Sequence, residues 1–156
     1  NRTEEYLNWR YFKHPIIDYH FMEFVVNNEL KGFAVIRLED NNKEVKAARL
    51  LDIICEKNYD IDIFNHIITY CNNKVDFIDF FCTGKFYEVG LENAGFIKDK
   101  ENKLKIPTVF NPIDHNRRES MNFFYSNNSK NRYEIDLNDI NNWYLVKSDS
   151  DQDRGN

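Results

Sequence analysis

The sequence predicts an α+β fold built on a mixed sheet, in which an antiparallel meander is joined to a central parallel pair of strands flanked by helices. Three apolar segments joined by short polar turns favour the meander. A segment with helical periodicity then separates the third apolar segment from a fourth, and this strand–helix–strand order favours a parallel pairing with a right-handed crossover. At 156 residues, the chain has the length of one ordinary domain with its own core.

The first predicted elements are a helix and the meander. A helix is expected over residues 3–12, because Thr3 is a good N-cap and the backbone before Pro15 avoids the helical region. The turns of the meander are expected at Asn27-Asn28 and Asn41-Asn42. The strands are expected over residues 19–26, 32–38 and 46–55.

A crossover helix is expected over residues 61–73, with Asp60 as its N-cap. Its apolar face is predicted to comprise Ile61, Phe64, Ile68 and Cys71, widened by Ile67 and Tyr70. The next stretch, residues 75–97, begins as an apolar run that suits a strand buried on both faces. It continues as a short helix, which Gly95 is expected to end.

The C-terminal third of the chain is more polar. We expect an extended segment over residues 104–113 and a long loop or flap over residues 114–142. Trp143–Val146 is predicted to form a final strand, and residues 148–156 a solvated polar tail. Asp149, Asp151 and Asp153 match the opening of a calcium loop, but Arg154 stands where that loop requires glycine. The interpretation as a solvated tail is therefore preferred over a calcium site.

Charge and composition limit the partners. A net charge of −5 gives no basic face for nucleic acid, and no apolar run has the length of a membrane span. Cys55, Cys71 and Cys82 all lie in apolar segments, which indicates core thiols in a reducing, cytoplasmic location. The histidines and cysteines show no metal-ligand spacing, so no metal site is expected. Because the chain begins with Asn1 rather than Met, we also expect an upstream domain in a longer chain.

The element order is similar to that of the GNAT acyltransferase fold. LENAGFI, residues 91–97, resembles the Y-E-x-x-G-F stretch of GNAT proteins. NWRYFKHP, IPTVFNP and the closing WYLVKSDSDQDRGN resemble the C-terminal GNAT-like region of certain bacterial surface-polysaccharide biosynthesis proteins. The resemblance implies a single GNAT-like domain over residues 1–156. It also implies transfer of an acyl group from acetyl-CoA, or another acyl-CoA, to a small-molecule amine such as an amino sugar or nucleotide sugar.

In the chemistry that this resemblance implies, the thioester lies where the third and fourth strands separate, and a backbone N–H polarises its carbonyl. The cofactor's pyrophosphate lies at the N-terminus of the crossover helix, where free amides favour anions. Ile54, Cys55 and Lys57 are then the expected cofactor contacts. Glu56 is the candidate base, and Tyr87 is the candidate acid that protonates the leaving thiolate.

Several residues oppose this chemistry. The turn CEKNYDIDIF contains no glycine, and its carboxylates, including Glu56 and Asp60, stand where the phosphates would lie, with Lys57 offsetting one of them. Leu91 occupies the position of the family's tyrosine, with Tyr87 one turn earlier. A surface role for Glu56 and a packing role for Tyr87 are the competing interpretations.

Two other functions are therefore kept open. One is a non-catalytic GNAT-fold domain that supports a partner domain, forms a homodimer or covers a substrate site. The other is a glycan-binding module, which would need Trp9, Trp143 and nearby tyrosines to be exposed together.

Overall fold

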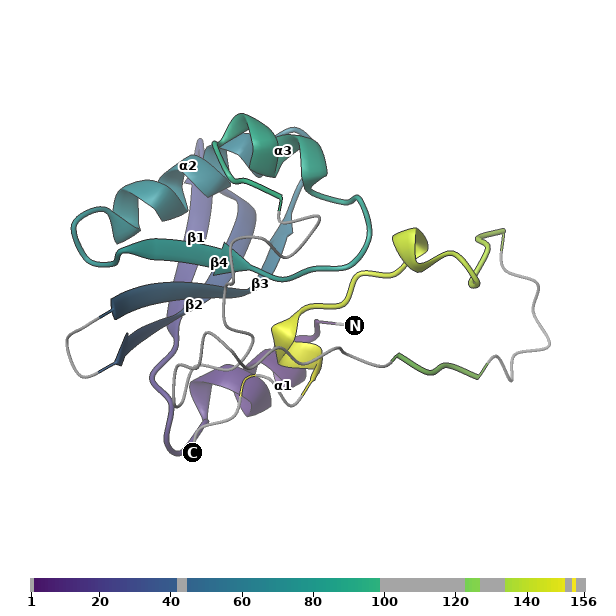
Figure 1. Ribbon diagram of the computed structural model, residues 1–156, viewed down its shortest axis with the longest axis horizontal. Coiled ribbons are helices and arrows are strands. Elements are labelled where there is room, and N and C mark those ends of the chain that lie inside the picture. The colour runs from purple at the N-terminus through teal and green to yellow at the C-terminus, as the bar shows by residue number, and fades with distance from the viewer. Residues whose placement is uncertain (1, 42–44, 99–122, 127–133, 151–152, 154–156) are drawn as a thin grey trace.

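The computed structural model describes residues 2–41, 45–98, 123–126, 134–150 and 153, and Figure 1 shows its architecture. These residues form an α+β fold around a four-stranded mixed sheet in the order β1-β2-β3-β4. The β1–β2 and β2–β3 pairs are antiparallel and the β3–β4 pair is parallel, so the predicted meander and parallel step are confirmed. The strands are β1 His20–Val26, β2 Glu29–Asn41, β3 Val45–Cys55 and β4 Phe77–Phe80.

Local backbone geometry explains the meander. Asn27 and Asn28 both adopt positive φ (52° and 64°), as the two-residue turn of a twisted hairpin requires. In β3, Leu51 is the extra residue of a β-bulge, because Val35 pairs with Asp52 whereas Ile36 pairs with Leu50. Both Leu51 and Asp52 are completely buried, so the bulge places a carboxylate inside the sheet.

Helix α2 (Asp60–Cys71) covers one face of the sheet, together with α3 (Glu88–Asn93) (Figure 1). Two details of the α2 prediction are wrong. Asp60 is the first helical residue rather than the N-cap, because the Tyr59 carbonyl accepts the Ile63 amide (3.0 Å) and makes Tyr59 the N-cap. The buried face keeps the expected Phe64, Ile67 and Cys71 but adds Ile63, whereas Ile61 and Ile68 are only partly buried. This face packs on Met22, Ala34, Ile36, Ala48, Leu50 and Ile53.

The N-terminal helix covers the other face of the sheet. It consists of α1 (Glu4–Leu7) and a π-helical turn, η1 (Asn8–Phe12). The Thr3 hydroxyl accepts a hydrogen bond from the Tyr6 amide (3.2 Å), so the predicted N-cap is confirmed. Tyr11 is 3% exposed and packs with Val35 and Leu51 in a second, smaller core.

The stretch 75–97 forms the predicted order of elements with a shorter strand. β4 has four residues, of which only Asp79 is buried, so the expected strand buried on both faces is wrong. Within the described residues, the parallel pair also lies at the sheet edge rather than in its centre. Gly95 ends α3 with φ of +92°, and the Phe96 amide donates to the Leu91 carbonyl (2.9 Å).

The C-terminal expectations need correction. Trp143–Val146 does not form a strand and makes one isolated bridge, between Val146 and Cys82. Ser148 and Asp153 are buried, so the predicted solvated tail is wrong at these residues. Short 3-10 turns occupy Ile140–Asn142 (η2) and Lys147–Asp149 (η3).

The remaining expectations fall largely outside the described residues. These are the second residue of the Asn41-Asn42 turn, the extended segment 104–113 and most of the loop 114–142. Among the helices that the structure does describe, none combines the length and apolar character needed to cross a membrane.

Candidate functional site

The site predicted from the resemblance lies where β3 continues past its parallel partner. The β3–β4 pairing ends at Leu50 and Phe80, whereas β3 extends to Cys55. The Tyr144 hydroxyl accepts a hydrogen bond from the Ile53 amide (3.1 Å) and lies 2.9 Å from the Ile53 carbonyl oxygen, to which it can donate. The Tyr87 hydroxyl lies 3.3 Å from the same carbonyl oxygen. Side chains therefore fill this notch.

The two tyrosines form a packed plug. Their ring centroids are 5.8 Å apart at an interplanar angle of 79°, and Phe64 packs edge-on against Tyr87. Burial raises the pKa of both tyrosines well above the ordinary value. The candidate acid Tyr87 is thus a half-buried residue whose hydroxyl already hydrogen-bonds to the strand backbone.

The other residues predicted for this site do not converge on a common point. The Glu56 carboxylate is exposed and lies 3.2 Å from Lys31 Nζ, and no hydrogen bond joins it to Tyr87 among the described residues. Lys57 is exposed and Ile54 is 38% exposed. The structure brings one pair together, because the Cys55 thiol lies beside the Tyr87 hydroxyl. Burial and the charge of Asp60 raise the pKa of Cys55 to about 11.

The expected phosphate position at the start of α2 holds a carboxylate. Asp60 lies against Gly90 of α3 so closely that a Cβ added to Gly90 would overlap the Asp60 side chain. Asp62 adds a second carboxylate to the first turn. The chain before the helix turns at Asn58, with φ of 75°. The N-terminus of α2 is therefore acidic, and Gly90 of α3 packs directly against it.

Sequence reasoning missed a second feature, on the face that carries Tyr11. Charged side chains from the strands and from both ends of the described chain meet there in a largely buried network, called here the ionic cluster. Its cations are Arg2, Arg10, Arg37, Arg49 and Lys147, and its anions are Glu39, Asp52, Asp79, Asp149 and Asp153.

Asp153 is a buried anion of the ionic cluster with three side-chain partners. Its carboxylate accepts from Arg10 Nη2 (2.8 Å), Arg37 Nη1 (3.0 Å) and the Tyr19 hydroxyl (2.7 Å). The side chain is 1% exposed. Arg10 Nε also donates to the Ser148 carbonyl oxygen (3.3 Å). The NWRYFKHP and SDSDQDR stretches therefore contact each other directly.

A second carboxylate, Asp52, connects the ionic cluster to the notch. It accepts from Arg2 Nε and from the Tyr11 hydroxyl (3.2 Å), and the Tyr144 hydroxyl lies 3.2 Å from its other oxygen. Arg2 also binds Asp149 (2.8 Å). Burial raises the pKa of Asp52, while the charge of Arg2 opposes this rise.

The third carboxylate, Asp79, lies next to two buried cations. Lys147 Nζ donates to its Oδ2, and Arg49 Nη2 lies 3.8 Å from the same oxygen. Asp79 Oδ1 is buried without a hydrogen bond from any described residue. Burial lowers the pKa of Arg49 to about 10 and also lowers that of Lys147.

A sequence signal for the ionic cluster existed. Single carboxylates interrupt the apolar runs LLDIIC and FIDFF, at Asp52 and Asp79, and Arg37 and Glu39 alternate along one strand. Since a charge inside a sheet needs a partner, these positions predict buried ion pairs. The pattern does not indicate that the partners come from the two ends of the chain. Asp149 and Asp153, read earlier as a tail, are such partners.

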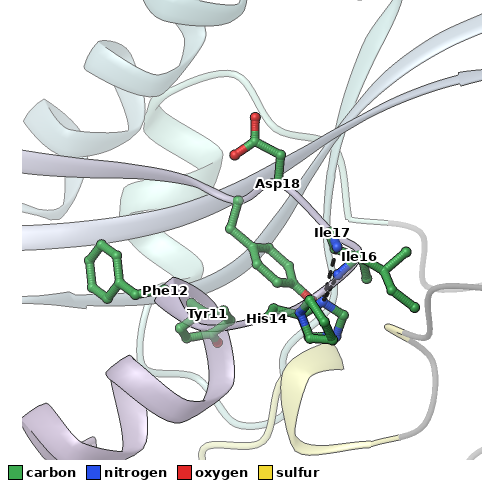
Figure 2. A pocket seen from close by; sticks show the side chains of 8 residues that line it. Tyr11, Phe12, His14, Ile16, Ile17 and Asp18 are labelled. Atoms are coloured by element: carbon green, nitrogen blue, oxygen red, sulfur yellow. Dashed lines mark hydrogen bonds between the residues drawn. The ribbon is translucent and has the colours of Figure 1, made fainter.

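A pocket of about 360 Å³ lies beside the ionic cluster, between η1 and the start of β1 (Figure 2). Its walls are residues 11–12 and 14–19. His14 contributes a polar ring to its wall, and Nδ1 accepts from the Ile17 amide (3.0 Å), which fixes the ring orientation. The described residues contain no group of three His, Cys, Asp or Glu side chains that could hold a metal ion.

The two tryptophans weighed for glycan binding belong to separate groups. Trp9 is 69% exposed and packs beside Tyr6, with centroids 6.1 Å apart. Trp143 packs against Phe123 (5.0 Å) and Tyr125 (5.3 Å). No ring contact among the described residues joins the two groups. The common aromatic surface that a glycan-binding module would need is therefore not formed by direct ring contact.

Comparison with known proteins gives no family for the chain. No family model, curated protein or solved structure matches it.

Proposed function

We propose that this chain is a non-catalytic domain with a GNAT-like sheet, which supports or covers a partner instead of transferring an acyl group. The observation that carries the proposal is the Tyr144 hydroxyl, which bonds both the amide and the carbonyl of Ile53. The resemblance places the thioester in this notch, where it would need a free backbone N–H.

Displacing Tyr144 is costly. A ligand would have to replace both of its hydrogen bonds to Ile53, and a buried backbone group left without one costs about 1–3 kcal/mol. The ring of Tyr144 also packs against Tyr87 and Phe86. These contacts indicate a packed part of the core rather than a preformed binding site.

The start of α2 gives independent support. Asp60 and Asp62 place two carboxylates at the helix end where the resemblance puts a diphosphate. Each carboxylate suits the helix dipole, which is a term of about 0.3–1 kcal/mol, and each repels a phosphate at the same place. Without glycine in the preceding turn, the backbone cannot easily approach an anion closely.

A surface suited to a partner lies on the opposite side of the molecule from α2. Phe12, Phe21 and Phe33 form a row of rings with successive centroid distances of 4.9 and 5.0 Å. Phe12 is 60% exposed, and the neighbouring turn carries the exposed Ile16. Contiguous apolar surface of this kind is typical of protein–protein contacts. This row supports a role for the domain in association.

Isothermal titration calorimetry with acetyl-CoA tests the proposal. We expect no saturable heat up to millimolar ligand for this chain, alone or with an amino-sugar acceptor present. Saturable binding below millimolar, with release of free CoA thiol in the presence of an amine, would overturn it. The same thiol-release assay on a longer chain that includes any upstream domain shows whether activity belongs to a partner.

Acyl transfer from acetyl-CoA to an amine is the second candidate function. One observation favours it. The pairing of the parallel strands β3 and β4 ends at Leu50 and Phe80, and the resemblance places the thioester where these strands separate. This candidate requires Tyr144 to leave Ile53 before the cofactor enters. A positive calorimetry result would select it.

A further inference from the structure

The C-terminal part of the described chain runs across the edge of the sheet and joins the notch to the ionic cluster. We call Trp143–Ser150 together with Asp153 the strap; it is part of the yellow segment in Figure 1. It contains η3 and makes one isolated β-bridge. The strap is therefore attached to the sheet mainly by individual contacts rather than by a strand ladder.

The first half of the strap closes the notch. Tyr144 bonds the Ile53 backbone, as described above. The Thr83 amide donates to the Leu145 carbonyl (2.9 Å), and the Leu145 amide donates to the Thr83 hydroxyl (3.0 Å). Two backbone amides outside the strap, those of Ile53 and Thr83, thus depend on the strap for their hydrogen bonds.

The second half of the strap binds through charge. Lys147 pairs with Asp79 of β4, and Asp149 pairs with Arg2. Asp153 pairs with Arg10 of η1 and Arg37 of β2. These partners come from separate parts of the fold, so no single element holds the strap.

The chemistry of these contacts makes the strap separable from the rest of the fold. Val146 is the only fully buried hydrophobic residue of the described strap, and Tyr144 packs partly buried against the main core. The remaining attachment consists of the hydrogen bonds to Ile53 and Thr83 and of buried ion pairs, whose attraction is largely offset by the cost of removing the charges from water. Segments with few buried apolar contacts open at a lower free energy than the core does.

We propose that the strap is a cooperative unit that detaches while the sheet and α2 stay folded, and that its release uncovers the Ile53 backbone and Asp52. The strap is then a conformational device that controls access to the β3 edge. This inference is independent of the proposed function, because it concerns opening of the chain and not what binds there.

Hydrogen exchange measured by NMR tests the proposal. The amides of Ile53, Thr83 and Leu145 should exchange through one common opening, faster than the α2 amide of Ile67. Asp153→Asn should speed exchange of the three strap-dependent amides about ten- to a hundred-fold, the change expected when a hydrogen bond to a charged group is lost. Ile67 should still exchange more slowly than these three amides, because its exchange requires unfolding of the core as well as release of the strap.

The matched control is Glu29→Gln. It removes a carboxylate from an exposed pair with Lys31, next to the turn that joins β1 and β2. It should leave all four exchange rates unchanged. The dependence of wild-type exchange on low concentrations of urea tests the proposal without a variant. Exchange through a local opening should depend only weakly on urea, because little surface is exposed. Ile53 and Leu145 exchanging as slowly as Ile67, with the same dependence on urea, would overturn the proposal. Failure of Asp153→Asn to speed exchange at Ile53, Thr83 and Leu145 would do the same.

Discussion

Arg10 and Asp153 are 143 positions apart in the chain, and their charged groups meet at 2.8 Å. Arg10 belongs to the N-terminal π-helical turn and Asp153 lies beyond the strap's last turn. The pair is largely shielded from water, with side-chain exposures of 12% and 1%. It joins the two ends of the described chain across one face of the sheet.

Removing this carboxylate should destabilise the fold strongly. Asp153→Ala leaves Arg10 and Arg37 buried without their shared partner, and breaking one side of a buried pair costs about 3–5 kcal/mol. Glu29→Ala, which breaks an exposed pair, should cost less than about 1 kcal/mol. Urea unfolding followed by circular dichroism measures both. Equal losses in the two variants would show that burial of the Asp153 pair does not increase its contribution to the free energy of unfolding.

The sheet was predictable because its signals are local. Alternation, Asn-Asn turns and the helical period of residues 60–71 each depend on a few neighbouring residues, and the predicted strand order followed from them. The length of β4 was not predictable in the same way. The apolar run after Val75 is longer than the four residues that pair. Beyond them, Tyr144 rather than β4 accepts the hydrogen bond of the β3 amide at Ile53.

The candidate site was less predictable, because its contacts are non-local. Nothing near Ile53 in the sequence indicates that its amide is satisfied by Tyr144, 91 positions later. The same holds for the tail, whose aspartates resemble solvent-exposed residues until Arg2 and Arg10 are placed beside them. The absence of glycine before α2 was visible from the sequence and agrees with the acidic helix end.

Alkaline pH should destabilise the protein early. Burial raises the pKa of Tyr11, Tyr19, Tyr87 and Tyr144, to about 12 for Tyr19. Above about pH 10, the unfolded chain loses these protons while the folded chain keeps them, so stability falls by about 1.4 kcal/mol per pH unit for each group. Arg49, whose pKa is lowered to about 10, and Lys147, whose pKa is also lowered, oppose this trend as two groups against the four tyrosines.

Urea midpoints at pH 8, 10 and 11 measure this alkaline loss, and absorbance at 295 nm reports tyrosinate formation in the folded chain. We expect the midpoint to fall above pH 10, with the four buried tyrosines ionising only as the chain unfolds. A constant midpoint up to pH 11 would contradict the prediction.

The thiols should react slowly. Burial raises the pKa of Cys55 and of Cys82 to about 11, so at pH 8 each is about a hundred-fold poorer in thiolate than an ordinary cysteine. Cys71 is buried in the core as well. Reaction with Ellman's reagent should therefore be at least about a hundred-fold slower in the folded chain than in 6 M guanidinium. Fast labelling of any one cysteine in the folded chain would show that its environment is open.

The packing of α3 on α2 leaves no room for a Cβ at Gly90 unless the Asp60 side chain moves. Alanine favours a helix over glycine by about 1 kcal/mol, but its Cβ would overlap Asp60. We expect Gly90→Ala to destabilise the fold by about 1–3 kcal/mol through overpacking. Combining it with Asp60→Ala should recover part of that loss, because the carboxylate that obstructs the Cβ is gone. Additive effects in a double-mutant cycle measured by urea unfolding would contradict the contact.

Tyr144→Phe should have a larger effect than Tyr87→Phe, although both remove one hydroxyl from the same notch. The Ile53 amide has the Tyr144 oxygen as its partner, so Tyr144→Phe leaves a buried donor unsatisfied at a cost of about 1–3 kcal/mol. Tyr87→Phe removes a second donor to the Ile53 carbonyl, which Tyr144 still serves, and a contact with Cys55, and should cost less than about 1 kcal/mol. Thermal and urea unfolding of the two variants rank these effects. If Tyr87→Phe proved the more damaging, Tyr144 would not be the group that closes the β3 edge.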